Sequence, residues 1–393
     1  MTSKTGWTND PSAVRTPPLG PAYPPRPGRR LQAAGPASAL PTMLKPTPIP
    51  LLALAALLVW AGGATVAALP HPVPVLFDTD MDSDCDDLGA LALLHALADR
   101  GEARLLAVIT TTNDPHAPLC ADAVNTWYGR GDIAIGVLDP KGQPLRQRSR
   151  YTKAVAEACP HDLASYADAE DAVHVYRQAL AAEPDDTVVV VTVGHLTSLA
   201  RLLDSGPDAI SPLSGPDLVR RKVRLWSCMG GQYPKGKEPN FYRPDPASTV
   251  RAVTAWPGRA VFSGAEIGNA IATGARLAET SAANPVRIGY ERYFGQPGRS
   301  RASWDQTAVL YAVRGAGVCW NLQATGHCHV NPDGSNAWLP TPDKPHAYLK
   351  QKMDPTGVAR IIEDLMVSLP KRASAGRPPR LPKPPSSGKE PMP

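Results

Sequence analysis

The chain has 393 residues, of which 43% are hydrophobic and 20% are charged, and its formal net charge is +5. These values are ordinary for a globular protein, and the length suits one large domain. The basic excess lies at the ends: residues 1–70 and 371–393 together contribute +10, which leaves the body near −5. A nucleic-acid partner is therefore not predicted.

The first 68 residues read as a leader. Residues 1–42 are rich in Pro, Gly, Ala and Arg without an apolar period, which predicts disorder, or no translation at all if Met43 is the true start. Lys45, an apolar core and a run of small residues then give 43–68 the layout of a signal peptide, with cleavage after Ala67 or Ala68.

An exported protein, periplasmic or secreted, is therefore expected, and the alternative is an uncleaved membrane anchor over 50–69. The Pro-, Lys- and Arg-rich segment 371–393 predicts a second disordered tail, which is basic. One folded domain over 71–370 remains between the leader and the tail.

An acidic segment lies between a buried strand, 73–77, and the start of a buried helix at Leu88. It holds six carboxylates within ten residues and no His: Asp78, Asp80, Asp82, Asp84, Asp86 and Asp87. Such a cluster repels itself unless a cation neutralises it, and carboxylate oxygens suit Ca²⁺ or Mg²⁺. The loop follows a strand, where ligands bind in open α/β sheets.

Other readings of this loop fit less well. An EF-hand requires Gly at its sixth position and Glu at its twelfth, where this chain has Ser83 and Gly89. A phosphoryl-transfer pair would use Asp78 and Asp80 and leave the later aspartates without a role. A solvated acidic turn at a helix start satisfies the dipole preference but does not need six carboxylates.

The segment resembles the signature of the inosine-uridine-preferring nucleoside hydrolases, Asp-x-Asp followed by a spacer and Asp-Asp. The four family positions are filled, Asp84 is an extra carboxylate, and Asp82 stands where the family usually has Gly. The family residues are Asp78, Asp80, Asp86 and Asp87.

Further family motifs follow in order. Asn113 ends the second strand, where the family residue faces the ribose, although an ordinary turn residue would look the same. Val193 ends the strand whose carbonyl completes the metal shell. Met229 opens Met-Gly-Gly, and Glu238 with Asn240 match the Glu-x-Asn that grips sugar hydroxyls.

The last motif is Trp304-Asp305, which resembles a His-Asp pair at a helix start. Asp305 carries over as the final metal carboxylate, although it would also serve as a plain helix cap. The His that assists departure of the base in purine-cleaving relatives is replaced by Trp304, which cannot donate a proton to a ring nitrogen in that way but can stack on a base.

The resemblance implies a Ca²⁺-dependent hydrolase of N-glycosidic ribosyl bonds, an exported and divergent member of the family. Its water attacks the anomeric carbon, and Asp80 takes the proton. The ion is held by Asp80, Asp86, Asp87, Asp305 and the Val193 carbonyl. Asp78 and Asp84 stand behind these ligands and orient them. The substrate would contact Asn113, Met229, Glu238, Asn240 and Trp304.

The expected partner is a small-molecule riboside or a related glycoside, and a homo-oligomer stays open. The alternative function is a catalytically silent protein that keeps the calcium and sugar pocket. Six scattered cysteines contain no Cys-x-x-Cys pair, so a zinc site is not predicted. Export would permit disulfides, and Cys319 with Cys328 is the best candidate pair.

Strands and helices are expected to alternate. This predicts an α/β fold: a Rossmann-like, mainly parallel sheet with helices on both faces. The expected strands are 73–77, 104–111, 132–137, 187–193, 222–228 and 259–262. The expected helices are 88–100, 118–129, 166–182, 195–204, 246–255, 264–274, 304–314 and 355–369.

Overall fold

The structure is a computed structural model, and it describes residues 71–371 except for residue 143. The predicted leader over 1–68 and all but the first residue of the predicted tail lie outside the described residues. Within the described part, no helix combines the length and apolarity that crossing a bilayer requires. The signal peptide, the anchor and the domain borders therefore remain predictions.

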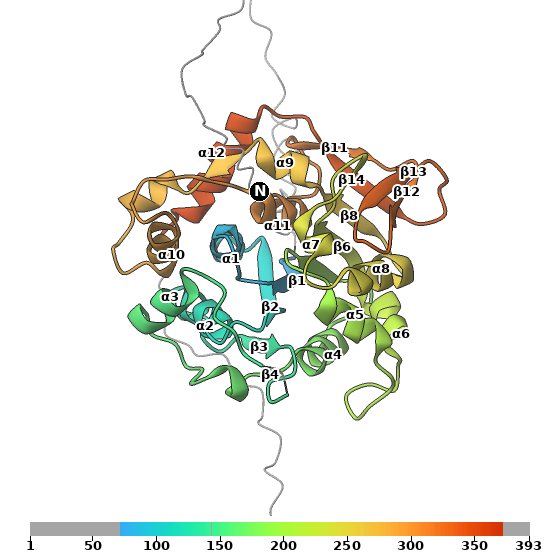
Figure 1. Cartoon of the computed structure of the whole chain (residues 1–393), viewed down its shortest axis with the longest axis horizontal. Coiled ribbons are helices and arrows are strands. Elements are labelled where there is room, and N and C mark those ends of the chain that lie inside the picture. Colours follow the sequence, from blue (N-terminus) through green and yellow to red (C-terminus); the bar gives the residue numbers. More distant parts are fainter. Residues whose placement is uncertain (1–70, 143, 372–393) are drawn as a thin grey trace, which may run out of the picture. The chain divides into compact units, whose positions relative to one another are not determined.

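A nine-stranded sheet forms the centre of the described domain (Figure 1). Its order is β11-β14-β8-β6-β5-β1-β2-β3-β4, and every pairing is parallel except that of β11 with β14. The strands are β1 Val73–Thr79, β2 Ala103–Thr110, β3 Ala134–Val137, β4 Glu170–Asp171, β5 Val188–Thr192, β6 Val223–Met229, β8 Ala260–Ser263, β11 Trp320–Gln323 and β14 His346–Gln351.

The central strands are buried on both faces, which explains their apolar, β-branched sequences. All five residues of β5 are buried, and four of them are valine. Along β1, Val75 and Phe77 pack into one core while Leu76 packs into the other, as the alternation of a strand requires. Asp78 and Thr79 are therefore the last two residues of a strand whose two faces are already covered.

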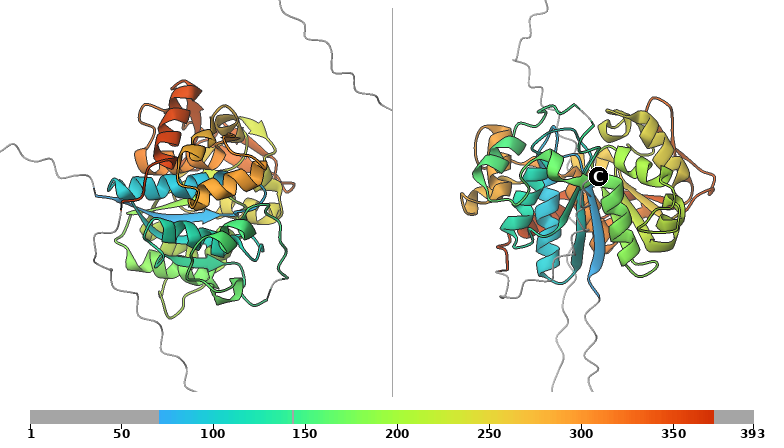
Figure 2. Two further views of the ribbon diagram at one scale, coloured as in Figure 1. Left: turned by 90° about the vertical axis from the view of Figure 1, so that its left-hand side faces the viewer. Right: turned by 90° about the horizontal axis from the view of Figure 1, so that it is seen from below.

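Helices cover the two faces of the sheet (Figure 2). One core contains residues of α1, α2, α10, α11 and α12, and the other contains residues of α4, α5, α6 and α8. Their bounds are α1 Asp86–Asp99, α2 Ala117–Trp127, α4 Ala172–Ala182, α5 Thr197–Asp204, α6 Gly215–Lys222, α8 Pro246–Ala255, α10 Pro285–Phe294, α11 Trp304–Arg314 and α12 Pro355–Met366.

The remaining elements are short. There are two small sheets. One pairs β9 with β10, and the other has the order β12-β13-β7. They consist of β7 Lys235–Gly236, β9 Ala272–Thr273, β10 Arg301–Ala302, β12 His327–Val330 and β13 Asn336–Leu339. The short helices are α3 Thr152–Ala158, η1 Tyr166–Asp168, α7 Pro239–Tyr242, α9 Ala265–Asn269 and η2 Ala275–Glu279.

The predicted α/β fold is confirmed, and the six predicted strands are adjacent in the sheet as β8-β6-β5-β1-β2-β3. Two predicted helices were too long. The helix expected over 166–182 begins at Ala172, after η1 and β4, because Asp171 caps it by accepting from the backbone N–H groups of Val173 and His174. The helix expected over 264–274 ends at Asn269, and β9 follows.

The cysteine prediction also differs from the structure. All six cysteines are free, buried thiols, so Cys319 and Cys328 are not paired. Cys328 lies on β12 in a separate small sheet, and its sulfur accepts a hydrogen bond from the Tyr233 hydroxyl at 3.4 Å. The short sequence separation of the two cysteines therefore does not bring them together.

Candidate active site

The acidic loop runs from the end of β1 to the start of α1, at the carboxyl edge of the parallel sheet. Its tightest residue is Met81, with a φ of 45° in the left-handed region, and the Met81 backbone N–H donates to Asp87 at 3.1 Å. Asp82, the departure from the family Gly, does not need this conformation. The unusual side chain therefore does not strain the loop at its own position.

The end of β5 reaches this loop because residue 194 is glycine. A Cβ at Gly194 would lie 2.6 Å from the backbone nitrogen of Asp80 and 2.7 Å from its Cβ. No side chain fits at that distance. Gly194 thus allows the chain that follows Val193 to lie against the backbone of Asp80.

Four carboxyl groups of the predicted metal set share one strongly acidic environment. Burial, followed by repulsion from neighbouring aspartates, raises the pKa of Asp80, Asp86 and Asp305 well above the ordinary value. Burial raises the pKa of Asp87 to about 7, against hydrogen bonds from the Thr79 hydroxyl and the Met81 N–H. Each of these groups would ionise at its ordinary pKa only if positive charge were added nearby.

Two helix N-termini meet at this cluster. Asp86 is the first residue of α1, and its Oδ2 accepts from the backbone N–H of Asp305 in the first turn of α11 at 3.2 Å. Positive helix ends favour carboxylates, but each contributes a fraction of one charge. The Oδ1 atom of Asp86 is buried without a hydrogen-bond partner among the described residues. The cluster is thus only partly compensated by the protein.

Within the described residues, one group of carboxylates could hold a metal ion: Asp84, Asp86 and Asp87, whose ligand oxygens all lie within 4.8 Å of one another. An orphaned buried oxygen and an all-carboxylate donor set suit a hard divalent cation. Asp84 was expected to stand behind the ligands, whereas the structure gives it a place in this group. It is also the partner of Arg301.

Asp78 lies under the loop on β1. It is buried, and burial raises its pKa to about 8 although the Tyr176 hydroxyl donates to its Oδ2 at 2.6 Å. Its other oxygen has no partner among the described residues. Tyr176 belongs to α4, so this hydrogen bond links the acidic loop to the opposite face of the sheet.

Both extra aspartates of the loop are paired with arginines. Asp82 lies 2.7 Å from Arg148, which belongs to the segment between β3 and α3. Asp84 lies 3.0 Å from Arg301 on β10. The sequence contains one indication of these partners. Asp82 and Asp84 are carboxylates in addition to the family motif, and carboxylates that are removed from water need counterions. The sequence did not indicate which of the chain's many arginines would supply them.

Asn113 follows β2, but its amide faces the neighbouring loop. Its side-chain Nδ2 donates to the Pro144 carbonyl at 2.8 Å, and the backbone carbonyl of Asn113 accepts from the Arg146 N–H at 3.0 Å. The next residue, Asp114, is fully buried and was missed by the sequence analysis. Its carboxylate accepts from the backbone N–H groups of Arg148 and Ser149, at 2.7 and 3.0 Å.

Asp114 accepts further hydrogen bonds from the Gln147 amide and the Thr152 hydroxyl, at 3.1 and 3.2 Å. A single carboxylate thus fixes the loop that carries Arg148. In the sequence, Asp114 is a single Asp that follows Asn113 at the end of a strand. An Asp at such a position cannot be distinguished from an ordinary turn residue.

The sugar-binding candidates form one connected group. Asn240 donates from Nδ2 to the Val193 carbonyl at 2.8 Å, and the Met229 sulfur lies 3.2 Å from the same Nδ2. Glu238 is buried, caps α7 by accepting from the Asn240 N–H at 2.9 Å, and accepts from the Gly231 N–H at 3.0 Å. Burial raises the pKa of Glu238 to about 7.

His195 lies directly after Gly194 and was given no role by the sequence analysis. It is buried, and its Nδ1 lies 3.0 Å from the Thr197 hydroxyl, which donates to Asp245 at 3.0 Å. Burial lowers the pKa of His195 to about 4, against the carboxylate of Asp245. The imidazole is therefore neutral near pH 7.

Trp304 begins α11 and is half-buried. Its Nε1 donates to Asn269 at 2.9 Å, and the Arg301 guanidinium lies 4.6 Å from its ring centroid. The ring also rests on the backbone of Gly268, where a Cβ would approach within 2.3 Å of it. The indole is thus fixed on three sides beside Asp305.

Comparisons with known proteins identify the family and the fold. A model of the family described as inosine-uridine preferring nucleoside hydrolase matches residues 75–339. No match was found among curated protein sequences.

Several solved structures share the fold. A plant nucleoside hydrolase, PpNRh1, is 16% identical with a TM-score of 0.57, over 76% of this chain and 99% of that one. The inosine-uridine preferring enzyme of Bacillus anthracis is 17% identical with a TM-score of 0.54, over 75% and 99%. The type III effector XopQ, solved with adenosine diphosphate ribose, is 16% identical with a TM-score of 0.56, over 77% and 94%.

The family model spans well over half of the chain, from β1 to β13. It includes the acidic loop and the segments that carry Val193, Glu238 and Asp305. The low identities mark a divergent member. The chain belongs to the inosine-uridine preferring nucleoside hydrolase family.

Proposed function

We propose that this protein is a Ca²⁺-dependent hydrolase that cleaves N-glycosidic bonds of ribosyl compounds. The observation that carries the proposal is the buried carboxylate cluster at the carboxyl edge of the sheet, in which Asp86 keeps an oxygen without a partner among the described residues. Such a cluster is costly to bury unless it serves a cation.

The proposed ligands are Asp80, Asp86, Asp87, Asp305 and the Val193 carbonyl, with Asp84 as a further carboxylate in reach. When bound, the cation would supply Lewis acidity to a water molecule and to the ribose hydroxyls. Its positive charge would lower the raised pKa values of these carboxyl groups, so that they would be ionised when the cation is bound. Calcium is proposed over magnesium because the proposed set has four carboxylates and a carbonyl, whereas Mg²⁺ usually keeps several waters and is held by one or two carboxylates.

Asp80 is the proposed general base. Asp80 is half-buried, whereas Asp86 and Asp87 are fully buried, so Asp80 is the carboxylate that a water molecule can reach most readily. Accepting the proton of the attacking water is the kind of step that a positioned carboxylate accelerates. Asp78 would hold the end of β1 through Tyr176 and so fix the position of Asp80.

Glu238 and Asn240 would bind the sugar hydroxyls. Asn240 holds the Val193 carbonyl, and Glu238 is fixed by two backbone N–H groups, so both side chains are positioned in advance. The carboxylates around the ring would stabilise the positive charge that develops on the ribosyl group. Trp304 would stack on the leaving group, and Asn113 and Met229 would line the pocket.

A screen of nucleosides and other ribosides, with and without a chelator, tests the proposal. Chelator-sensitive release of free ribose from at least one substrate is expected, and it should return when Ca²⁺ is restored. Tight Ca²⁺ binding without turnover across a broad glycoside panel would favour the second candidate, a silent calcium- and sugar-binding protein. The presence of Asp80 together with Glu238 and Asn240 supports the enzyme.

Export is part of the proposal and rests on the sequence of 43–68 alone. The N-terminus of protein recovered from the periplasm or the medium should begin at Ala68 or Leu69. Recovery of the intact chain from the membrane fraction would support the anchor over 50–69. Recovery of the whole chain from the cytoplasm would contradict export.

A further inference from the structure

Five arginines belong to the segment before α3 and to the stretch from α10 to β10, which leads into Trp304, and we call them the arginine rim. Two of them, Arg148 and Arg301, pair with the extra aspartates of the acidic loop. The other three are exposed. The rim consists of Arg148, Arg150, Arg292, Arg299 and Arg301.

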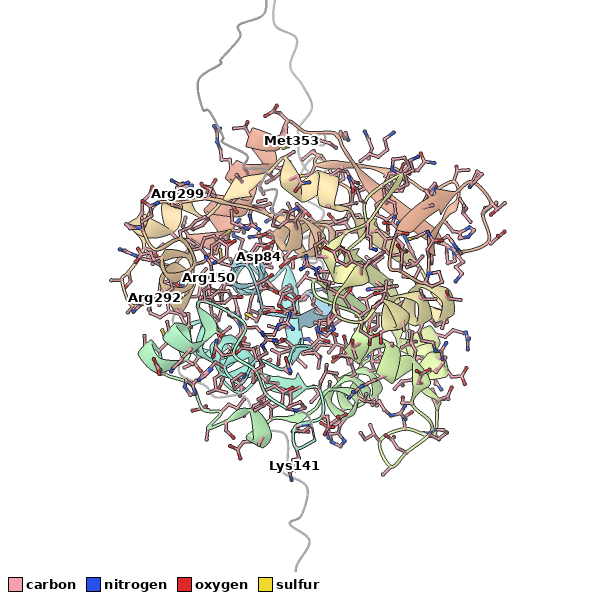
Figure 3. The ribbon with its side chains drawn as sticks, viewed as in Figure 1. Asp84, Lys141, Arg150, Arg292, Arg299 and Met353 are labelled. Atoms are coloured by element: carbon pink, nitrogen blue, oxygen red, sulfur yellow. The ribbon has the colours of Figure 1, made fainter. Side chains whose placement is uncertain are left out.

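The rim comes from two segments that meet. Arg148 and Arg150 precede α3, and Arg292 and Arg299 belong to α10 and the turn after it, and these two helices pack together. Arg148 and Arg150 are exposed on either side of the buried Ser149, and the Arg148 guanidinium reaches Asp82 of the acidic loop. Figure 3 shows Arg150, Arg292 and Arg299 on the same side of Asp84, toward α3 and α10.

The charge of the rim is not balanced. Arg148 and Arg301 each face one carboxylate, whereas the described residues place no carboxylate within 4.0 Å of Arg150, Arg292 or Arg299. The Nε–H group of Arg301 is also buried and lacks an acceptor within the described part of the chain. Three positive charges therefore remain on the segments that lead to the site, and one unused donor remains on Arg301 beside Asp84. Together they oppose the repulsion of anions by the acidic loop.

Arg301 forms part of the same surface as the aromatic residues. Its guanidinium lies 4.6 Å from the Trp304 ring centroid and 5.6 Å from that of Tyr293, and that of Arg299 lies 6.0 Å from the Phe294 ring. An aromatic surface edged by guanidinium groups suits a planar ring that carries a negative group, because guanidinium binds carboxylate and phosphate in a planar, two-pronged geometry.

We propose that the preferred substrate is a riboside whose aromatic aglycone carries a carboxylate or a phosphate, recognised by the arginine rim beside Trp304. This inference rests on the proposed function for the position of the leaving group. In the reaction, the N-glycosidic bond breaks and its electron pair stays on the aglycone nitrogen. A water oxygen bonds to the anomeric carbon, and one water proton goes to Asp80. The anionic group is unchanged and serves for recognition.

Nicotinate riboside and nicotinamide riboside provide a matched test, because they differ only in a carboxylate and a carboxamide. With the Ca²⁺-loaded full chain, kcat/KM should favour nicotinate riboside by about tenfold or more, the effect of one charged hydrogen bond. Arg301→Gln should remove most of this ratio, and Arg301→Lys should keep part of it. Arg220→Gln, an exposed, ion-paired arginine on α6, is the control and should leave the ratio unchanged.

A second pair places the anion on the sugar: uridine and uridine 5′-monophosphate. Preference for the monophosphate, without discrimination between the nicotinate and nicotinamide ribosides, would overturn the assignment to the aglycone. Equal kcat/KM within both pairs, unaffected by Arg301→Gln, would also overturn it while leaving the hydrolase function intact.

Calorimetric binding separates the two proposals. Suppose that no riboside is cleaved, but nicotinate riboside binds tenfold more tightly than nicotinamide riboside and Arg301→Gln abolishes the difference. The recognition site then stands and the hydrolase function fails. If the two ribosides bind equally, the rim does not recognise the anion. Melting curves of each variant check that the fold is kept.

Discussion

The side-chain amide of Asn240 donates a hydrogen bond to the backbone carbonyl of Val193 at 2.8 Å. This contact joins a residue expected to hold the sugar to a carbonyl expected to hold the metal. A carbonyl oxygen has two lone pairs, so it can accept from Asn240 and still face a cation. The proposed metal-binding and sugar-binding functions would therefore be coupled through one hydrogen bond.

Asn240→Asp should weaken both functions. The substitution replaces the donor with a carboxylate that faces the carbonyl oxygen, and it adds a charge to an acidic site. We expect Ca²⁺ affinity, measured by calorimetry, to fall by about tenfold or more, together with a higher KM. Asn321→Asp, at an exposed position of β11, is the control. An effect on KM alone would argue that the Val193 carbonyl is not a ligand.

Asp86→Asn should separate metal binding from folding. The variant loses one proposed ligand, so Ca²⁺ binding should weaken by about two orders of magnitude, a size typical of losing a charged partner. In the presence of a chelator its melting temperature should equal or exceed that of the wild type, because one buried like charge has been removed. Asp343→Asn, an exposed position, should alter neither quantity. Unchanged Ca²⁺ affinity would refute the assignment of Asp86.

Asp80→Asn should affect turnover more than folding. The substitution keeps the volume and one coordinating oxygen but removes the base, so kcat should fall by roughly 10²–10⁴-fold. Substrate binding to the Ca²⁺-loaded variant should persist, which calorimetry can measure. Near-normal kcat on a substrate that the wild type cleaves would exclude Asp80 as the base.

Trp304→His should change which leaving groups are accepted. An imidazole can protonate a departing purine, whereas the indole of Trp304 donates only its N–H, to Asn269. We expect kcat/KM for purine ribosides to rise relative to pyrimidine ribosides. Trp304→Phe keeps an aromatic ring without a proton donor and is the matched control. A similar shift in both variants would point to ring size rather than protonation.

Glu238 should make stability depend on pH when no metal is bound. Its pKa is raised from 4.5 to about 7, mainly by burial, so the folded state holds a proton that the unfolded state has lost between these values. The contribution of Glu238 to the free energy of unfolding is fully present below pH 4.5 and is lost as the pH rises through 7. The total loss is roughly 3 kcal/mol.

Melting curves with chelator between pH 4 and pH 8 measure this dependence. Glu238→Gln should reduce the fall in melting temperature over that range, although the amide itself will lower stability because it cannot accept from both backbone N–H groups. Glu157→Gln, an exposed position, should follow the wild type. Parallel curves for Glu238→Gln and the wild type would contradict the raised pKa.

The sequence predicted the central strands and the acidic loop because both depend on local patterns. An apolar run of β-branched residues predicts a buried strand, and six carboxylates together predict a cation, whatever the rest of the chain does. β14 was missed because His346–Gln351 mixes polar and apolar residues, and it is stabilised by pairing with β8, far away in the sequence. No local pattern reports such a pairing.

α10 was missed although its signals are local. Asn284 caps it, Pro285 is its first residue, and Gly295 ends it in a left-handed conformation. The arginine partners are a different case. That Asp82 would meet Arg148 and Asp84 would meet Arg301 depends on contacts across 66 and 217 residues, and side-chain charge alone does not select them.

The buried carboxylate of Asp114 has a consequence for how a substrate enters. The loop over residues 147–152 forms one wall of the site, since its Arg148 contacts Asp82 of the acidic loop. Asp114 fixes this loop through backbone and side-chain donors, so the entropic cost of ordering the wall is met during folding. A ligand that meets a wall already in position loses less affinity to ordering and does not wait for a slow closing step. Access to the site should then be limited by diffusion past the loop rather than by its rearrangement.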